Sequence, residues 1–272
     1  MKEILQIPPG LDGAAWHMEF ARRNRHYLHR HDELEVNLVL QGRGKYLLAD
    51  RTYDLTRCTQ IWLFPEQNHL LLEFSPEFQM WVLVFKPALV QRACTTDATR
   101  PLLELNPATA YCKELTEEQT RRLHHLFREV SDAATDPARH NAGLAYAMLT
   151  AWHAQLTADK IPGHADIHPA VERAIRMLRD EDMPLALADL ARHAGLSPAR
   201  LSRVFQEQTG QSITDFRNRQ RLERFLTLTA ADPRKKMIQA ALEAGFGSYP
   251  QFHRVFKQII GSSPQAYRRR AV

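Results

Sequence analysis

The chain has 272 residues, which is enough for two domains that each bury a core of their own. Hydrophobic residues make up 44% of it and charged residues 25%, and this composition excludes a largely disordered chain. The net charge of +5 is uneven: from His168 onward 18 basic and 10 acidic residues give +8, and the residues before it, with 18 and 21, give −3. A basic C-terminal part is typical of a phosphate-binding module joined to a domain that does not bind DNA.

Three further features bear on the compartment. The first residues, Met1 to Ile4, lack the apolar core and the cleavage site of an export signal. No run of about 18 apolar residues occurs anywhere in the sequence. The cysteines, Cys58, Cys94 and Cys112, are odd in number and lack the paired spacing of a zinc finger or a disulfide framework. We therefore expect a cytoplasmic protein with free thiols and no association with a membrane.

Residues from about 13 to 90 are predicted to form a β barrel or sandwich. Short runs of β-branched, aromatic and leucine residues alternate with turn signals such as Gln41-Gly42-Arg43-Gly44 and Ser75-Pro76. The predicted strands are Leu34–Leu40, Lys45–Ala49, Ile61–Phe64, Leu70–Phe74 and Gln79–Phe85. A barrel of this size can hold one small ligand.

Polar residues with a distinctive spacing lie inside this β region. His29 and His31 are separated by one residue, Glu35 follows four residues after His31, and Gly42 follows seven residues after Glu35. This spacing resembles the first motif of the cupin superfamily, and Pro65-x-x-x-His69 resembles a degenerate second motif. The two imidazoles alternate along a strand, so both are expected to point to one side.

Two interpretations of these residues stay open. In the first, His29, His31, Glu35 and His69 bind a divalent metal such as zinc or iron. In the second, the same four side chains only form hydrogen bonds in or around a ligand pocket. The ligand-binding set that we predict adds three aromatic residues as the apolar wall of that pocket: Tyr46, Trp62 and Trp81.

Two helices are predicted after the barrel, over residues 116–134 and 140–156. Thr116 and Gln119 fit a capping box at the start of the first helix. Four apolar residues of this helix form a stripe at helical spacing: Leu123, Leu126, Phe127 and Val130. The stripe either packs on the barrel or meets its counterpart in a second subunit. Residues 159–167 have lost this periodicity and contain Pro162 and Gly163, so we expect an interdomain linker there.

The last third of the chain contains one helix-turn-helix pattern twice, about fifty residues apart. Ala191-Arg192-His193-Ala194-Gly195 aligns with Ala241-Leu242-Glu243-Ala244-Gly245, and Arg203-Val204-Phe205 aligns with Arg254-Val255-Phe256. The alanines would let the two helices of each motif cross closely. The glycines would end the first helix in the left-handed conformation. The motifs are predicted over residues 187–208 and 235–260.

The second helix of each motif has start signals, a buried face and an outward face. Ser197-Pro198 supplies an N-cap with proline at the first helical position, and Ser248 with Gln251 reads as a capping box. The outward residues are Ala199, Arg200, Ser202, Arg203 and Gln206 in the first copy, and Tyr249, Pro250, Gln251, His253, Arg254 and Lys257 in the second. Arginine can bind guanine O6 and N7 together, and glutamine can bind adenine N6 and N7.

This duplicated pattern resembles the DNA-binding domain of the AraC/XylS family of bacterial transcription regulators, over roughly residues 168–270. The residues that carry the resemblance are Ile238, Ala241, Gly245-Phe246, Phe252-His253-Arg254-Val255-Phe256-Lys257, Gly261, Pro264 and Tyr267-Arg268. The resemblance implies base contacts by Ala199, Ser202 and Arg203 in the first motif and by Tyr249, Pro250, Gln251 and Arg254 in the second. It also implies a homodimer formed through helix 116–134. Two residues depart from the family pattern: Gln206 stands where lysine is usual, and Phe225 where alanine is frequent.

The sequence therefore predicts an α+β multidomain protein. Residues 1–158 would form a cupin-like ligand-binding and dimerisation domain, residues 159–167 a linker, and residues 168–272 an all-α domain with two helix-turn-helix motifs. The predicted function is regulation of transcription by sequence-specific binding to double-stranded DNA under control of a small-molecule effector. Two alternatives are a metal-dependent cupin enzyme that also binds DNA, and a constitutive DNA-binding protein whose barrel is purely structural.

Overall fold

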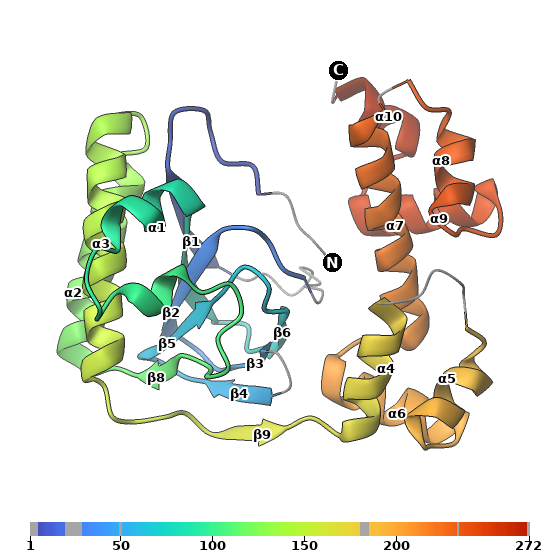
Figure 1. Ribbon diagram of the computed structural model, residues 1–272, viewed down its shortest axis with the longest axis horizontal. Helices are drawn as coiled ribbons and strands as arrows, with labels where there is room; N and C mark the ends of the chain where they lie inside the picture. Colours follow the sequence, from blue (N-terminus) through green and yellow to red (C-terminus); the bar gives the residue numbers. More distant parts are fainter. Residues whose placement is uncertain (1–4, 20–28, 49–50, 180–184, 233, 271–272) are drawn as a thin grey trace. The chain divides into compact units, whose positions relative to one another are not determined.

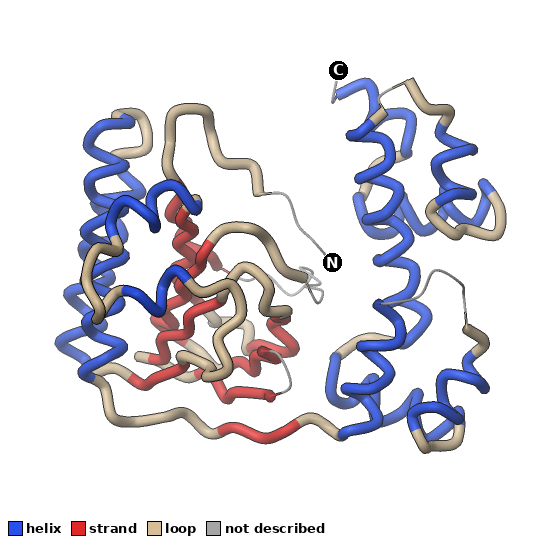
Figure 2. The backbone as a smooth tube through the Cα atoms, viewed as in Figure 1, coloured by secondary structure: helices blue, strands red, loops and turns tan. Residues whose placement is uncertain are grey.

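The computed structural model describes residues 5–19, 29–48, 51–179, 185–232 and 234–270. These residues divide into two compact units, which meet in the chain between Asp166 and Ile167 (Figure 1). We call them the β unit and the helical unit. The predicted fold class is confirmed, because β sheets with accompanying helices are followed by an all-helical unit (Figure 2). Residues 1–4, on which the expectation about an export signal rests, lie outside the described residues.

The β unit is built from two antiparallel sheets. The first has the strand order β1-β7-β2-β5-β8, and the second has the order β6-β3-β4-β9. The strands are β1 (Gly13–Glu19), β2 (Leu34–Gln41), β3 (Gly44–Leu48), β4 (Arg51–Leu55), β5 (Thr59–Leu63), β6 (His69–Phe74), β7 (Gln79–Phe85), β8 (Cys112–Glu114) and β9 (His164–Asp166). All five predicted strands are present, and β1, β4, β8 and β9 are additional.

The alternation of side chains divides the five-stranded sheet into two faces. Along β2, Val36 and Leu38 belong to a core that this sheet shares with the helices, which we call the helix-side core. Val39, with Ile61 and Leu63 of β5, belongs to a second core shared with strands of the other sheet, which we call the inter-sheet core. Glu35 and Asn37 have the parity of Val39 and therefore lie on the inter-sheet face.

Helices cover the outer face of the five-stranded sheet (Figure 1). They are α1 (Pro87–Ala93), the short 3₁₀ helix η1 (Arg100–Leu103), α2 (Glu117–Asp132) and α3 (Pro137–Thr157). The capping box predicted at Thr116 is confirmed, with both reciprocal hydrogen bonds present. Leu123, Phe127 and Val130 of α2 are buried in the helix-side core. The apolar stripe therefore packs within its own subunit and is not available to a second one.

The segment predicted as the interdomain linker, residues 159–167, contains a short strand. Residues 164–166 form β9, which pairs with β4 at the edge of the four-stranded sheet. Upstream, Lys160 forms an isolated bridge with Glu114. The local sequence does not indicate this strand, because the partner strand lies more than a hundred residues away in the chain.

The helical unit contains the two predicted helix-turn-helix motifs. Its helices are α4 (Pro169–Arg179), α5 (Leu187–Ala194), α6 (Pro198–Thr209), α7 (Ile213–Ala231), α8 (Met237–Glu243), α9 (Tyr249–Ile260) and α10 (Pro264–Arg270). The pairs α5/α6 and α8/α9 form the motifs, and α7 joins them. Gly195 and Gly245 have φ angles of 77° and 91°, so the predicted left-handed helix ends are confirmed. None of the described helices is long and apolar enough to span a membrane.

Gly195→Ala tests the turn of the first motif. A Cβ at this position would meet nothing closer than 3.6 Å, so the penalty comes from the backbone conformation alone. We expect the helical unit to lose about 1 to 2 kcal/mol of unfolding free energy. Urea unfolding followed by far-ultraviolet circular dichroism measures this loss. Tryptophan fluorescence should not change, because all four tryptophans precede residue 153.

The matched control is Gly247→Ala in the second motif, where φ lies outside the left-handed region and the nearest atom is 3.4 Å away. A loss there within about 0.5 kcal/mol, typical of a surface substitution, is expected. Equal losses for the two variants would contradict the assignment of the left-handed turn as the cause.

Candidate functional site

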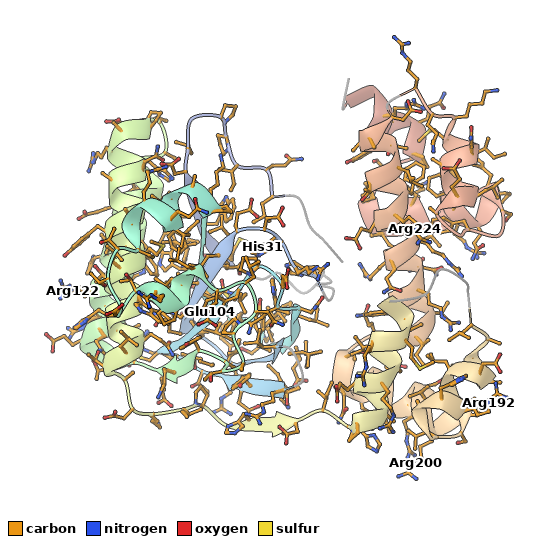
Figure 3. The ribbon with its side chains drawn as sticks, in the orientation of Figure 1. His31, Glu104, Arg122, Arg192, Arg200 and Arg224 are labelled. Carbon is orange, nitrogen blue, oxygen red and sulfur yellow. The ribbon has the colours of Figure 1, made fainter. Side chains whose placement is uncertain are left out.

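The helix α6 presents the first candidate DNA-reading surface. The Ser197 hydroxyl accepts a hydrogen bond from the Arg200 amide at 3.4 Å, and proline occupies the first turn. Leu201 and Phe205 are completely buried on the inner face. Ala199, Arg200 and Arg203 are exposed on the outer face, and Ser202 is half-buried. Arg200 extends outward from the start of the helix (Figure 3), and Arg203 lies 3.8 Å from the exposed Glu207 carboxylate.

The helix α9 presents the second candidate surface. Phe252, Val255 and Phe256 are buried on its inner face. Pro250, His253 and Arg254 are exposed on its outer face. Tyr249 is half-buried, with its ring centroid 5.5 Å from that of Phe252. The two helices therefore share one design, in which an apolar inner face leaves a basic and polar face outside.

Gln251 has a structural contact that the sequence prediction did not include. Its amide N–H donates to the Ser248 hydroxyl at 3.3 Å. Its side-chain Oε1 accepts from the N–H of Gly247 at 3.0 Å, one residue before the position expected for a capping box. Reading an adenine needs both the acceptor and the donor of this amide. In this conformation the NH₂ group of Gln251 and the second lone pair of its Oε1 are left for a base.

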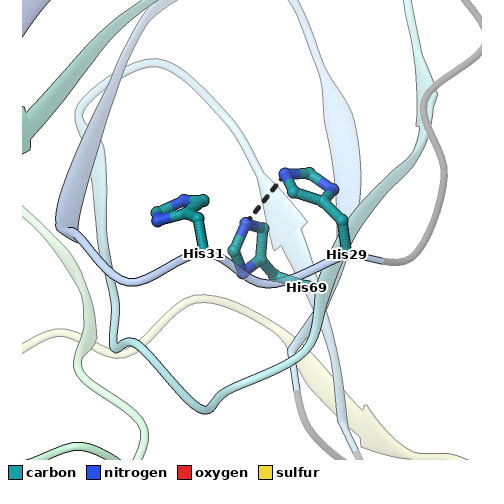
Figure 4. Close-up of side chains that lie close together, drawn as sticks. All are labelled: His29, His31 and His69. Atoms are coloured by element: carbon teal, nitrogen blue, oxygen red, sulfur yellow. Dashed lines mark hydrogen bonds between the residues drawn. The ribbon is translucent and has the colours of Figure 1, made fainter. Parts of the chain in front are cut away.

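Three histidines of the β unit converge into one cluster, which we call the histidine cluster: His29, His31 and His69. One ligand nitrogen from each lies within 4.8 Å of the others. His29 and His69 form an isolated bridge through reciprocal backbone hydrogen bonds of 3.0 and 2.9 Å. Their Nε2 atoms are 3.1 Å apart (Figure 4). The spacing of the sequence motifs predicted that these three histidines come together, although His69 lies 40 residues after His29 in the chain.

His69 is held as a neutral imidazole. It is fully buried, and burial together with the neighbouring His29 and His31 keeps its pKa well below the usual value. Its Nδ1–H donates to the Gln67 carbonyl at 3.1 Å, which leaves Nε2 as the acceptor. The short contact with His29 is therefore a hydrogen bond that His29 Nε2–H donates.

His31 has the opposite electrostatic surroundings. Burial by itself lowers its pKa, but the hydrogen bond and the charge of Glu35 outweigh burial, so the pKa of His31 is raised. Its Nδ1 donates to the Glu33 carbonyl at 2.9 Å, and its Nε2 donates to Glu35 Oε2 at 2.8 Å. The raised pKa favours the protonated imidazole, whose two N–H groups can donate to both partners at once.

Tyr46 and Asn37 complete the polar wall of the inter-sheet face. The Tyr46 ring is stacked against His69 with centroids 6.3 Å apart. Asn37 Nδ2 donates to the Tyr46 hydroxyl at 3.4 Å, and its Oδ1 is buried without a hydrogen-bond partner among the described residues. Sequence analysis missed Asn37. The signal was present, because Asn37 is two residues from Glu35 in an otherwise apolar strand.

Two predicted pocket residues lie on the other face of the sheet. Trp62 and Trp81 belong to the helix-side core, where the ring centroid of Trp62 is 5.4 Å from that of Trp152. The indole N–H of Trp81 donates to His124 Nδ1 of α2 at 2.9 Å. Their positions in β5 and β7 have the opposite parity to the inter-sheet residues. The expectation that they line a pocket with the histidines is corrected accordingly.

Comparisons with known proteins agree with this two-part organisation. Residues 10–151 match the model of an AraC-like ligand binding domain, and residues 190–270 match that of a helix-turn-helix domain. The uncharacterized HTH-type transcriptional regulator YfiF of Bacillus subtilis is 26% identical over 252 residues, which are 89% of this chain and 78% of that protein. The arabinose operon regulatory protein of Escherichia coli is 29% identical over 150 residues, which are 53% of this chain and 50% of that protein. Among solved structures, ToxT of Vibrio cholerae is 15% identical and aligns with a TM-score of 0.37 over 94% of this chain and 97% of that one.

The contact between Trp81 and His124 predicts that the stability of the β unit depends on pH. Burial, followed by Arg128 and the neighbouring histidines, lowers the pKa of His124 below the usual 6.5 of histidine. Unfolding then favours proton uptake, so the stabilisation is complete above pH 6.5 and is lost as the pH falls below it. We expect the urea midpoint of the wild type, followed by tryptophan fluorescence, to fall more than that of His124→Gln between about pH 7.5 and about pH 5.5. His153→Gln, which changes an exposed histidine of α3, should keep the wild-type pH dependence; equal dependence in all three proteins would contradict the role of His124.

Proposed function

Since the chain belongs to the AraC family of DNA-binding transcription regulators, we propose that α6 and α9 read two successive major-groove segments of one operator. The observation that carries this proposal is the repeated exposure of a basic, polar face on two helices whose inner faces are buried. Neighbouring segments on one side of the duplex are about 34 Å apart, one helical turn.

The predicted DNA-contacting residues of α6 and α9 differ in the chemical group that each offers to DNA. Arg203 and Arg254 have the fork geometry that binds guanine O6 and N7. Ser202 and Tyr249 offer hydroxyl groups, while Ala199 and Pro250 offer only apolar contacts, such as that with a thymine methyl. Arg200 and His253 stand beside these residues and suit phosphate or base contacts. Gln251 combines the cap of α9 with a donor toward the groove, so we assign it a positioning role as well as a reading role.

Arg254→Ala tests the reading role. We expect a loss of about 1 to 3 kcal/mol on the cognate operator, with relaxed discrimination at one base position. The operator is found by selection from random DNA, and the loss is measured by titration of labelled duplexes in fixed salt. Arg92→Ala, which breaks an exposed ion pair with Asp12 in the β unit, is the control and should bind as the wild type does. If Arg254→Ala weakened DNA binding equally on all sequences, Arg254 would be a phosphate contact and not a base-reading residue.

The β unit is proposed to bind a small-molecule effector on its inter-sheet face. His29, His31, Glu35, Asn37, Tyr46 and His69 form the polar part of that face. An effector controls DNA binding only if it binds two arrangements of the protein with different affinities. We propose that the protein works as a homodimer, as the resemblance implied for helix 116–134. Since the apolar stripe of α2 is buried, the contact would use its outward side, where Arg122 donates to the exposed Tyr146 hydroxyl of α3 at 3.4 Å (Figure 3).

The histidine cluster fits a divalent metal. Two nitrogens bound to one zinc ion at about 2.1 Å lie roughly 3.0 to 3.4 Å apart for angles between 90° and tetrahedral. The separation of 3.1 Å between the Nε2 atoms of His29 and His69 meets this requirement. The Gln67 carbonyl holds Nδ1–H of His69, so that its Nε2 faces His29. The Glu33 carbonyl fixes the His31 ring, whose Nε2 would have to exchange its hydrogen bond with Glu35 for the metal. Glu35 would supply the fourth ligand, and the metal would supply a charge to which an effector's oxygen or nitrogen could bind.

Metal binding is tested without an activity assay. Protein treated with chelator and then titrated with Zn²⁺ or Fe²⁺ should bind one ion per chain, as measured by calorimetry and elemental analysis. His69→Ala should weaken this binding by about 100-fold or more, since even a supporting residue is worth 10- to 100-fold. His17→Ala, an exposed histidine of β1, is the control. Failure of the wild type to bind either ion would refute the metal proposal and leave DNA reading untouched.

We infer that the protein acts through binding rather than catalysis, on cytoplasmic DNA. The relatives that cover most of the chain, YfiF and the melibiose operon regulatory protein of Escherichia coli, are named as regulators, which supports this inference. The competing enzyme would need a bound metal with an open coordination position. The constitutive alternative predicts the same operator affinity with and without cell extract.

A further inference from the structure

The last strand of the β unit is also the connection to the helical unit. β9 consists of His164, Ala165 and Asp166, and Ile167 follows directly as the first residue of the helical unit. β9 pairs with β4 at the edge of the four-stranded sheet, where Tyr53 is the partner of His164 and Arg51 is the partner of Asp166 (Figure 1). The contacts that hold β9 on the sheet therefore also determine how many unpaired residues connect the two units.

The contacts of β9 are largely exposed. All three of its residues are exposed, so β9 adds no side chain of its own to a core. The Arg51 guanidinium contacts the Asp166 carboxylate at 2.8 Å, and both groups are largely in solvent. The Thr52 hydroxyl donates to the Ala165 carbonyl at 3.2 Å, and the Asp54 amide donates to the Gly163 carbonyl at 2.7 Å. Exposed ion pairs and edge hydrogen bonds compete directly with water, so β9 has the character of an element that opens locally.

The segment around β9 is held on each side by a buried residue. Upstream, Pro162 is buried, and the Glu114 amide donates to the Lys160 carbonyl at 2.8 Å. Downstream, Ile167 is buried, and the His168 amide donates to the Gln208 side chain at 2.7 Å. Opening of β9 would therefore release residues 163–166. Four extended residues span at most about 14 Å, so the two subunits of a dimer would together gain up to about 28 Å, which is a large part of one helical turn of DNA.

A series of ring contacts joins β9 to the histidine cluster. The His164 ring is stacked on Tyr53 with centroids 5.8 Å apart. Tyr53 is the direct cross-strand partner of Tyr46, and both are buried in the inter-sheet core. Tyr46 is in turn stacked against His69. A change in the packing of His69 can thus be transmitted to β9 through the contacts of two tyrosines on adjacent strands.

We propose that β9 is a releasable clasp. A change in the side-chain packing of the histidine cluster alters its pairing with β4, through the contacts of Tyr46 and Tyr53. Paired, it leaves almost no free chain between the units. Released, it adds a tether of four residues in each subunit and widens the range of half-site separations that a dimer reaches. The clasp itself does not depend on the proposed function, whereas its effect on half-site separation rests on the proposed DNA binding and dimerisation.

The clasp is tested in the full-length protein by hydrogen exchange of the peptides that contain residues 52–54 and 163–166. Arg51→Ala/His164→Ala removes the ion pair and the ring contact, and these amides should exchange about tenfold faster or more. Arg92→Ala, which removes another exposed ion pair of the β unit, should not change them. A disulfide formed by Thr52→Cys/Ala165→Cys joins direct cross-strand partners and should slow exchange below the wild-type rate. Unchanged exchange in the first double variant would overturn the clasp.

The link to the histidine cluster is tested by a double-mutant cycle with the same readout. His69→Gln should change the exchange rate of residues 163–166 by about threefold or more in the wild-type background and not in Tyr53→Leu, because interacting sites are not additive. Tyr53→Phe keeps the ring and should restore the response. His124→Gln, a change in the helix-side core, should leave these residues as they are. The same response to His69→Gln in the Tyr53→Leu background would show that the tyrosines do not carry the coupling.

Paired operator half-sites measure the functional effect. When the half-sites are moved apart by about 10 base pairs, the oxidised disulfide variant should lose at least about tenfold in affinity relative to its reduced form. The released variant, Arg51→Ala/His164→Ala, should bind both separations within about threefold. If the oxidised disulfide variant and the released variant preferred the same half-site separation, the proposed effect of the tether would be refuted. Absence of DNA binding in the wild type would refute the proposed function, and the exchange measurements would still decide whether β9 is a clasp.

Discussion

The close approach of two helices in each helix-turn-helix motif is the constraint on which the DNA-reading surface depends. Ala191 and Ala194 in α5, and Ala241 and Ala244 in α8, are at most 1% exposed. A larger side chain there would push the second helix outward and rotate its reading face. The left-handed glycines and the serine caps serve the same purpose, because they fix where α6 and α9 begin. The orientation of the arginines on α6 and α9 is thus decided by buried alanines and helix caps on the other side of each motif.

In the β unit the corresponding constraint is the two-residue alternation of strands. It places Glu35 and Asn37 on the inter-sheet face and the tryptophans on the helix-side face of the same sheet. Burying two histidines, a glutamate and an asparagine in one core costs stability relative to apolar residues of similar size. A polar set that is expensive to bury and still converges on one point is therefore an argument for binding a ligand, since packing alone would be served better by leucine and valine.

How far the sequence alone predicts this structure follows from the range of the interactions. The helix-turn-helix motifs were predictable because caps, turn glycines and helical periodicity all act within a few residues. The strands β1 and β4 were missed: β1 has few β-branched residues, and β4 begins at Arg51, which read as part of a turn. β9 was missed because only its partner in β4 makes it a strand. The histidine cluster was predictable from its motif spacing, whereas Trp62 and Trp81 were misplaced because residues near one another in the chain were assigned to one side without counting strand parity.

The separation of a rigid reading surface from a weakly held connection also bears on control. The helix-turn-helix cores bury large aromatic residues such as Phe205 and Phe252, so an effector could alter their internal geometry only at a high cost. An edge strand whose own side chains are all exposed opens at a low cost, and a differential binding energy of about 1.4 kcal/mol already shifts such an equilibrium tenfold. A small effector makes few contacts and can supply little more than that difference. Regulation in this protein is therefore expected to act on the connection between the units, where the free-energy differences are comparable with those that a ligand can impose.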